Sequence, residues 1–110
     1  MATKNQIIKK KIEFINVHKY GKIFKSNSLI IQKLFDKKLN NSLKLGYKVT
    51  KKLGNAVKRN KAKRIMRDLV RRNMSKYGKN NFLYILTAKK ELFKTTFKDL
   101  EQEFIKLLTK

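Results

Sequence analysis

Few side chains in this sequence could perform acid–base or metal chemistry. Among 110 residues there are one histidine, His18, no cysteine, and seven aspartates and glutamates. A chain without cysteine forms no disulfide and no thiolate metal site. Glu13, Asp36 and Asp68 are far apart in the sequence, whereas a protein nuclease needs several carboxylates together to hold magnesium. We therefore expect no cofactor bound by the protein alone, and we expect Asp68, placed among arginines, to form an ion pair on a helix.

Positive charge dominates the sequence, and lysine and arginine are distributed differently along it. Thirty lysines and arginines face seven acidic residues, which gives a formal net charge of +23. All five arginines lie between Arg59 and Arg72. Arginine can hold phosphate oxygens with two parallel hydrogen bonds, which lysine cannot do. The pattern indicates geometric recognition of a polyanion in this segment and diffuse attraction elsewhere; nucleic acid is the leading partner and an anionic membrane surface the second.

The segment 56–74 is predicted to form a helix that presents its arginines on one face. At about 100° per residue, five apolar side chains fall on one stripe: Ala62, Ile65, Met66, Leu69 and Val70. Four polar side chains fall within an arc of roughly 60° on the far side: Asn60, Arg64, Arg67 and Arg71. Asn55 is a suitable cap. The free N–H groups of a helix start attract phosphate, and six cations surround this one: Lys51, Lys52, Lys58, Arg59, Lys61 and Lys63.

The remaining elements are predicted from hydrophobic periodicity. Helices are expected at 7–20 and 95–108, with Ile8, Ile12 and Ile15 inward in the first. In the second, capped by Thr95 or Thr96, the inward residues are Phe97, Leu100, Phe104 and Leu107. Strands are expected at 23–35, 43–50 and 81–88, the last central in its sheet because it is apolar on both sides. In the second strand, Leu43, Leu45, Tyr47 and Val49 face one way, and Lys44, Gly46, Lys48 and Thr50 the other. These elements predict one α+β domain over residues 1–110.

The residues that precede and begin the basic helix resemble a known family signature. They read KKLGNAVKRNKAKRIMR from Lys51 to Arg67, and the match extends from Tyr47 to Val70. This region is similar to the Arg-Asn-Arg motif of the bacterial ribonuclease P protein subunit. The main departure is Lys61, where the family usually has arginine, so the charge is kept and the two-pronged donor is lost.

The resemblance implies a fold, a function and partners. The implied fold is a compact α/β sandwich with three helices, a mostly antiparallel sheet of about four strands, and a left-handed β-α-β crossover that carries the motif helix. The implied function is the protein subunit of a cytoplasmic ribonucleoprotein, one protein with one catalytic RNA, that removes the 5′ leader of precursor tRNA. The RNA would perform the hydrolysis with magnesium ions. Neither DNA nor membrane would be a partner.

The resemblance also implies two groups of site residues. The residues expected to contact the catalytic RNA surround the motif: Lys51, Lys52, Asn55, Lys58, Arg59, Asn60, Lys61, Lys63, Arg64, Arg67 and Arg71. A cleft for the single-stranded leader would use Phe14, His18, Ile30, Gln32 and Lys48. His18 and Gln32 stand where aromatic residues are usual, so this cleft is expected to hold the leader more weakly, because stacking is worth roughly 1–3 kcal/mol per base.

Two alternatives follow from the residues alone. A basic RNA-binding protein of the ribosome or of another ribonucleoprotein would share the charge but not the long motif. Phe14 suits packing in the core about as well as contact with the leader. A helix–turn–helix DNA reader is not favoured, because no partner helix or dimer seam is evident.

Overall fold

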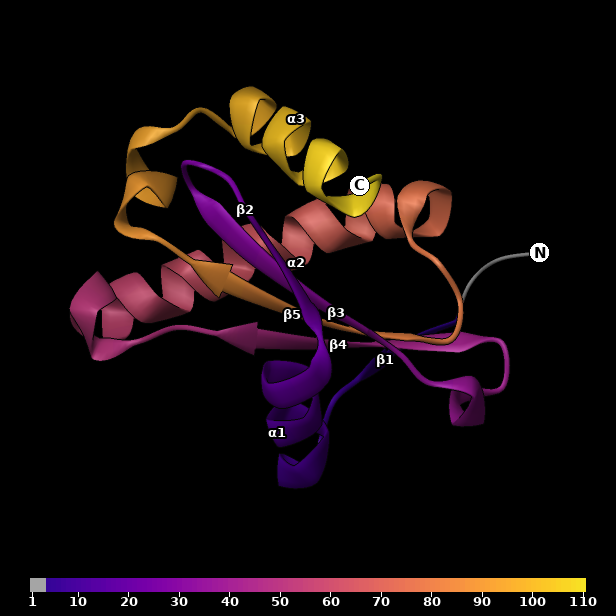
Figure 1. The fold of residues 1–110 in the computed structure, drawn as a ribbon. Helices are drawn as coiled ribbons and strands as arrows, with labels where there is room; N and C mark the ends of the chain where they lie inside the picture. The colour runs from indigo at the N-terminus through magenta and orange to yellow at the C-terminus, as the bar shows by residue number, and fades with distance from the viewer. Residues whose placement is uncertain (1–3) are drawn as a thin grey trace.

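The computed structural model describes residues 4–110 and contains five strands and three α-helices in an α+β arrangement (Figure 1). In chain order the elements are β1 (Lys4–Ile7), α1 (Lys11–Tyr20), β2 (Lys22–Lys25), β3 (Leu29–Phe35), β4 (Ser42–Lys48), α2 (Ala56–Tyr77), β5 (Phe82–Ala88) and α3 (Phe97–Leu108). Three short 3-10 turns link them: η1 (Lys37–Leu39), η2 (Lys51–Leu53) and η3 (Lys90–Lys94). No helix within residues 4–110 is both long and apolar enough to cross a membrane.

All five strands form one mixed sheet in the order β1-β4-β5-β3-β2. The pairs β1–β4 and β4–β5 are parallel, whereas β5–β3 and β3–β2 are antiparallel. The central position of β5 is confirmed. The predicted α+β fold with three helices is confirmed. The sheet has one strand more than the expected four, because β1 joins it, and half of its pairings are parallel rather than most being antiparallel. Helix α2 connects the parallel neighbours β4 and β5, as the predicted crossover requires; its left-handed sense stays a prediction.

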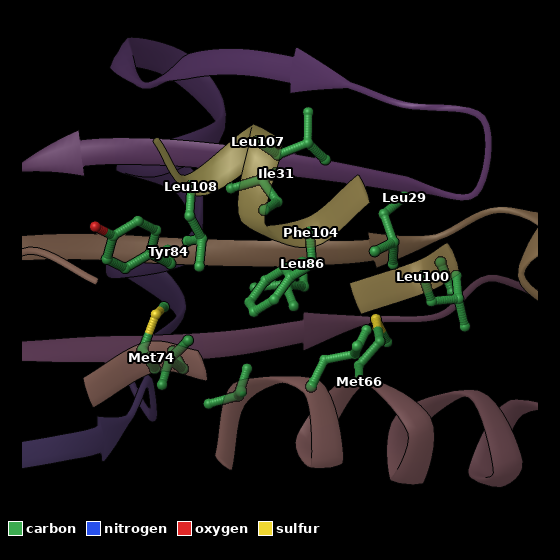
Figure 2. Packing of buried hydrophobic residues seen from close by; sticks show 14 of the residues in the cluster. Leu29, Ile31, Met66, Met74, Tyr84, Leu86, Leu100, Phe104, Leu107 and Leu108 are labelled. Carbon is green, nitrogen blue, oxygen red and sulfur yellow. The ribbon is translucent and has the colours of Figure 1, made fainter. Parts of the chain in front are cut away.

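The sheet separates two hydrophobic layers. Helices α2 and α3 cover one face, and α1 covers the other (Figure 1). On the larger side, Met66 and Met74 of α2 meet Phe104 and Leu107 of α3 above Leu86 of β5 (Figure 2). The smaller layer contains Ile8, Val17, Leu39, Leu83 and Ile85. The alternation predicted for β4 is confirmed, because Leu43 and Leu45 belong to the larger layer while Gly46 lies against α1.

The first helix begins later than predicted. Residues 4–7 pair with β4 instead, and the backbone N–H of Ile8 continues this contact by donating to the carbonyl of Leu45 at 2.9 Å. The expected stripe of isoleucines was also wrong for two of its members: Ile12 and Ile15 are 56% and 44% exposed. Instead of these isoleucines, the fully buried Val17 and the partly buried Phe14 fix α1 to the sheet.

The single strand predicted at 23–35 is a hairpin of β2 and β3 with its turn at residues 26–28. The carboxylate of Glu103 in α3 orders this turn, because it accepts from Ser26 Oγ at 2.6 Å and from the backbone N–H of Ser28 at 3.0 Å. Ser28 Oγ also lies 3.2 Å from the second carboxylate oxygen and 2.8 Å from Thr95 Oγ1. Helix α3 therefore sets the place where the chain reverses.

Candidate RNA interface

Helix α2 is firmly held at both ends. Asn55 caps its start as predicted: the side-chain oxygen accepts from the backbone N–H of Lys58 at 3.0 Å. The helix continues three residues beyond the predicted end and stops at Gly78, whose N–H donates to the carbonyl of Met74 at 2.8 Å. The predicted apolar stripe is confirmed, since Ala62, Met66, Leu69 and Val70 are buried and Ile65 is partly buried against the core.

Burial of that stripe leaves the arginine face in solvent. Asn60, Arg64, Arg67 and Arg71 are all exposed on the side of α2 opposite the core. Asp68 forms the predicted ion pair with Arg71, one turn further along the helix. An exposed pair of this kind contributes little to stability. Its effect is to hold one guanidinium while Arg64 and Arg67 remain available to a polyanion.

Two aromatic rings border the arginine face. The guanidinium of Arg67 lies 5.8 Å from the centre of the Tyr47 ring, and that of Arg72 lies 5.1 Å from the centre of the Phe97 ring. Burial raises the pKa of Tyr47, an effect that the positive charge of Arg67 opposes. A shallow groove of about 580 Å³ runs along this surface between α2 and Phe97. The first turn of α3 thus borders the arginine face.

The start of α2 gathers cations without acidic partners on its own first turn. Lys51, Lys52, Lys58 and Lys61 are exposed, whereas Arg59 and Lys63 are half-buried. The Nε atom of Arg59 is buried and has no hydrogen-bond partner among the described residues. Free N–H groups and surrounding lysines make this end of the helix attractive to phosphate.

The opposite face of the sheet contains a separate cleft of about 560 Å³, beside α1. It brings together four of the five residues predicted to bind the leader: Phe14, His18, Gln32 and Lys48. Ile30 lies outside its lining but on the same face of β3, two residues from Gln32. Four further residues complete the lining: Lys11, Ile15, Lys19 and Ile85. The spacing of 11, 15 and 19 along one helical face could have identified the first three from the sequence.

Phe14 serves the core and the cleft at the same time. Its ring lies directly over Gly46 of β4: a β-carbon placed there would be 2.7 Å from Cζ and 2.8 Å from Cε1 of the ring. Phe14 packs against the smaller hydrophobic layer and is only partly buried, so one side of the ring still lines the cleft. Phe14 can therefore pack in the core and still present part of its ring to the cleft.

The floor of the cleft carries an unsatisfied polar group. Gln32 is 6% exposed, and its Nε2 atom is buried without a hydrogen-bond partner within residues 4–110. A buried donor without an acceptor costs about 1–3 kcal/mol. Above it, Lys11, Lys19 and Lys48 add positive charge to the rim.

The acidic residues of the described chain are spread over several structural contacts. Glu13 pairs with Lys44 at 2.9 Å, Asp68 with Arg71, and Glu103 with the hydroxyls of the β2–β3 turn. Residues 4–110 contain no group of three or more histidine, cysteine, aspartate or glutamate side chains that could hold a metal ion together.

The fold is a mixed α+β sandwich. An arginine-bearing crossover helix lies on one face of the sheet, and a basic, aromatic cleft lies on the other. This combination defines a small RNA-binding protein. The comparison with protein families identifies which one: the family described as Ribonuclease P matches residues 2–110, and the chain belongs to this family.

Named relatives agree over almost the whole chain. The ribonuclease P protein component of Mycoplasma mycoides is 35% identical over 103 residues, which covers 94% of this chain and 93% of the relative. That of Clostridium botulinum is 34% identical over 107 residues, covering 97% and 95%. The solved structure of the Staphylococcus aureus RNase P protein has 28% identity and a TM-score of 0.81, and the match covers 96% of this chain and 94% of that one. The Thermotoga maritima RNase P protein, at 24% identity and a TM-score of 0.80, shows the same fold.

Proposed function

We propose that this chain assembles with one catalytic RNA and holds the 5′ leader of precursor tRNA while that RNA, with its magnesium ions, performs the hydrolysis. The observation that carries the proposal is the fixed orientation of α2. Its buried stripe attaches it to the sheet, and this attachment determines where Arg64 and Arg67 point. A flexible basic tail would give no such geometry.

Docking on the catalytic RNA would use the start of α2 and its arginine face. Arg59, Asn60, Arg64 and Arg67 would make positional contacts to phosphates, and the exposed lysines of η2 would add screened attraction. Tyr47 supports this role, because its ring lies beside the guanidinium of Arg67 and restricts that side chain before RNA arrives. Less conformational entropy is then lost on binding.

The test of docking is assembly affinity with the catalytic RNA across a salt series. Arg67→Ala should weaken binding and flatten the log–log salt dependence by somewhat less than one unit, as expected for one lost phosphate contact. Arg64→Lys keeps the charge and loses one of two parallel hydrogen bonds, which is worth about 1 kcal/mol or about fivefold in affinity. The matched control is Lys106→Ala, an exposed cation in the last turn of α3. Equal losses for Arg67→Ala and Lys106→Ala would show that binding depends on charge number alone.

The leader would lie in the cleft beside α1. Phe14 offers the exposed side of its ring for stacking, Lys48 offers charge, and Gln32 offers a buried donor that a base could satisfy. Phe14→Ala should weaken binding of leader-bearing precursor tRNA more than binding of leaderless tRNA. Equal losses for the two ligands would restrict Phe14 to the core.

Chemistry by the RNA predicts that the protein alone is inactive. Three carboxylates support this prediction of inactivity, because each already has a structural partner: Glu13, Asp68 and Glu103. Magnesium-dependent cleavage of precursor tRNA by purified RNA-free protein, lost in Asp68→Asn or Glu13→Gln, would contradict it.

A further inference from the structure

A second aromatic hollow lies on the face of the sheet opposite the leader cleft. It has a volume of about 580 Å³ and is lined by residues of β2, β3 and β5 and by the segments around them: Tyr20, Lys22, Phe24, Lys33, Leu34, Phe35, Lys79, Phe82, Tyr84 and Lys110. The side chains on the face of the sheet away from α1 include Phe24, Lys33 and Tyr84, because they alternate along their strands with residues that face α1. The hollow is therefore separate from the leader cleft. Tyr84 marks the end of the larger core next to it (Figure 2).

Two aromatic residues of the hollow, Phe35 and Tyr20, are largely exposed, whereas Tyr84 beneath them is buried. Phe35 is 59% exposed, and the centre of its ring lies 5.6 Å from that of Phe82 in an edge-to-face contact. Phe82 in turn lies 5.9 Å from Tyr84, whose hydroxyl accepts from the backbone N–H of Lys79 at 2.9 Å. Tyr20 adds a ring that is 67% exposed. The partly buried Phe82, itself packed against the buried Tyr84, therefore holds the exposed Phe35 ring, as in a platform for stacking.

The charges of the hollow are unbalanced. Lys22 and Lys33 are directly opposite each other across the β2–β3 pair, an arrangement of like charges that destabilises a sheet. The ion pairs formed among the described residues lie elsewhere, and the residues that line the hollow include no aspartate or glutamate. The ammonium of Lys33 already donates to main-chain oxygens of Leu108 and Lys110, whereas Lys22 and Lys79 face no acidic side chain among the lining residues. Burial and the nearby charge of Lys79 lower the pKa of Lys33 to about 8. An incoming anion would relieve both repulsions.

We propose that this hollow binds an unpaired stretch of RNA, with a base stacked on Phe35 and the adjoining phosphate near Lys22 and Lys79. Exposed rings and lysines without acidic neighbours are the combination that single-stranded nucleic acid requires. An acidic peptide would also meet the charge, but it would leave the ring faces without the flat partners that bases provide. The site goes beyond the proposed function, because it needs neither α2 nor the cleft beside α1.

The experiment measures binding of a short oligouridylate to the full chain, with photo-crosslinking of a thiouridine analogue to map the contacts. Phe35→Leu keeps an apolar side chain and removes the ring, and it should weaken binding about fivefold, the effect of one lost stack at the low end of the measured range. Phe35→Tyr should restore affinity. Lys79→Gln should reduce the salt slope by about 0.7. Crosslinks should fall in β3 and β5 around Phe35 and Phe82.

Phe14→Leu is the matched control, because it makes the same substitution in the other cleft. If the two sites are independent, Phe14→Leu should remove only the crosslinks to α1 and leave those around Phe35 and Phe82 unchanged. Unchanged binding by Phe35→Leu, crosslinks confined to α1 and α2, or binding of an acidic peptide in preference to the oligonucleotide would each overturn the proposal. A negative result for the hollow would leave the proposed function untouched, because assembly with the catalytic RNA is tested separately with the Arg64→Lys and Arg67→Ala variants.

Discussion

Replacing Gly46 with alanine tests how the sheet shapes the leader cleft. The new β-carbon would lie 2.7 Å from Cζ and 2.8 Å from Cε1 of Phe14, and 3.4 Å from Cδ1 of Ile8. Carbon atoms at their optimal separation are about 3.5–4.0 Å apart. The Phe14 ring must therefore move by about 1 Å, whereas the contact with Ile8 needs little adjustment.

The cost of this movement follows from where the ring can go. Overpacking a core costs typically about 1–3 kcal/mol. Phe14 is only partly buried and can shift toward the open cleft, so we expect a loss of about 1–2 kcal/mol in the free energy of unfolding. The shifted ring would also occupy space that the leader needs. Leader-bearing precursor tRNA should then bind more weakly, while leaderless tRNA binds as before.

The assay is urea unfolding of four proteins: wild type, Gly46→Ala, Phe14→Leu and the double variant. Leucine lacks the Cε1 and Cζ atoms that make the close contact, so Gly46→Ala should cost much less in the Phe14→Leu background. The coupling between the two changes should be about 1 kcal/mol and favourable in the double variant. An equal cost of Gly46→Ala in both backgrounds would show that the Phe14 ring is not the obstacle to the new β-carbon.

Three further outcomes follow from single contacts. Asn55→Ala should lower the free energy of unfolding by about 1 kcal/mol through loss of the α2 cap, whereas Asn60→Ala, on the exposed face, should be neutral or slightly stabilising; equal losses in urea unfolding would contradict this. Glu103→Gln should cost about 1–3 kcal/mol by weakening the bonds to Ser26 and Ser28, while Glu91→Gln should change little, and faster amide exchange of the β2–β3 turn should accompany the loss. Because the pKa of Lys33 is lowered from 10.5 to about 8 in the fold, the unfolded chain binds more protons between these values; the contribution of Lys33 to the free energy of unfolding should therefore rise with pH over this window. A rise of the same size in Lys33→Met would show that other groups cause it.

The basic helix and its orientation could be predicted because their cause is local. The period of Ala62, Met66 and Leu69 selects the buried side of α2, and the same geometry places Arg64 and Arg67 on the exposed side. Alternation in β4 determined which side chains face α1 in the same way. Asn55 correctly predicted the start of α2, whereas the helix ends three residues later than predicted, before Gly78.

The α1 cleft was predicted only in part, because its members come from elements far apart in the chain. The resemblance named Phe14, His18, Gln32 and Lys48, and the structure brings these four together. The helical pattern of isoleucines misled the prediction for Ile12 and Ile15. A chain with net charge +23 can leave apolar side chains on an outer face, so hydrophobicity alone did not select the buried side.

Elements whose signal lies within one helix turn or one strand could be predicted from the sequence. Features that depend on partners distant along the chain could not, because only the folded protein brings those partners together. Strand β1 exists because β4 offers a parallel edge, and the β2–β3 turn is ordered by Glu103, which follows it by more than 70 residues. The aromatic hollow of Phe35 and Lys79 likewise forms only where strand ends and helix ends converge. Local periodicity carries no information about such contacts, because they depend on how the layers pack once the chain has closed its long loops.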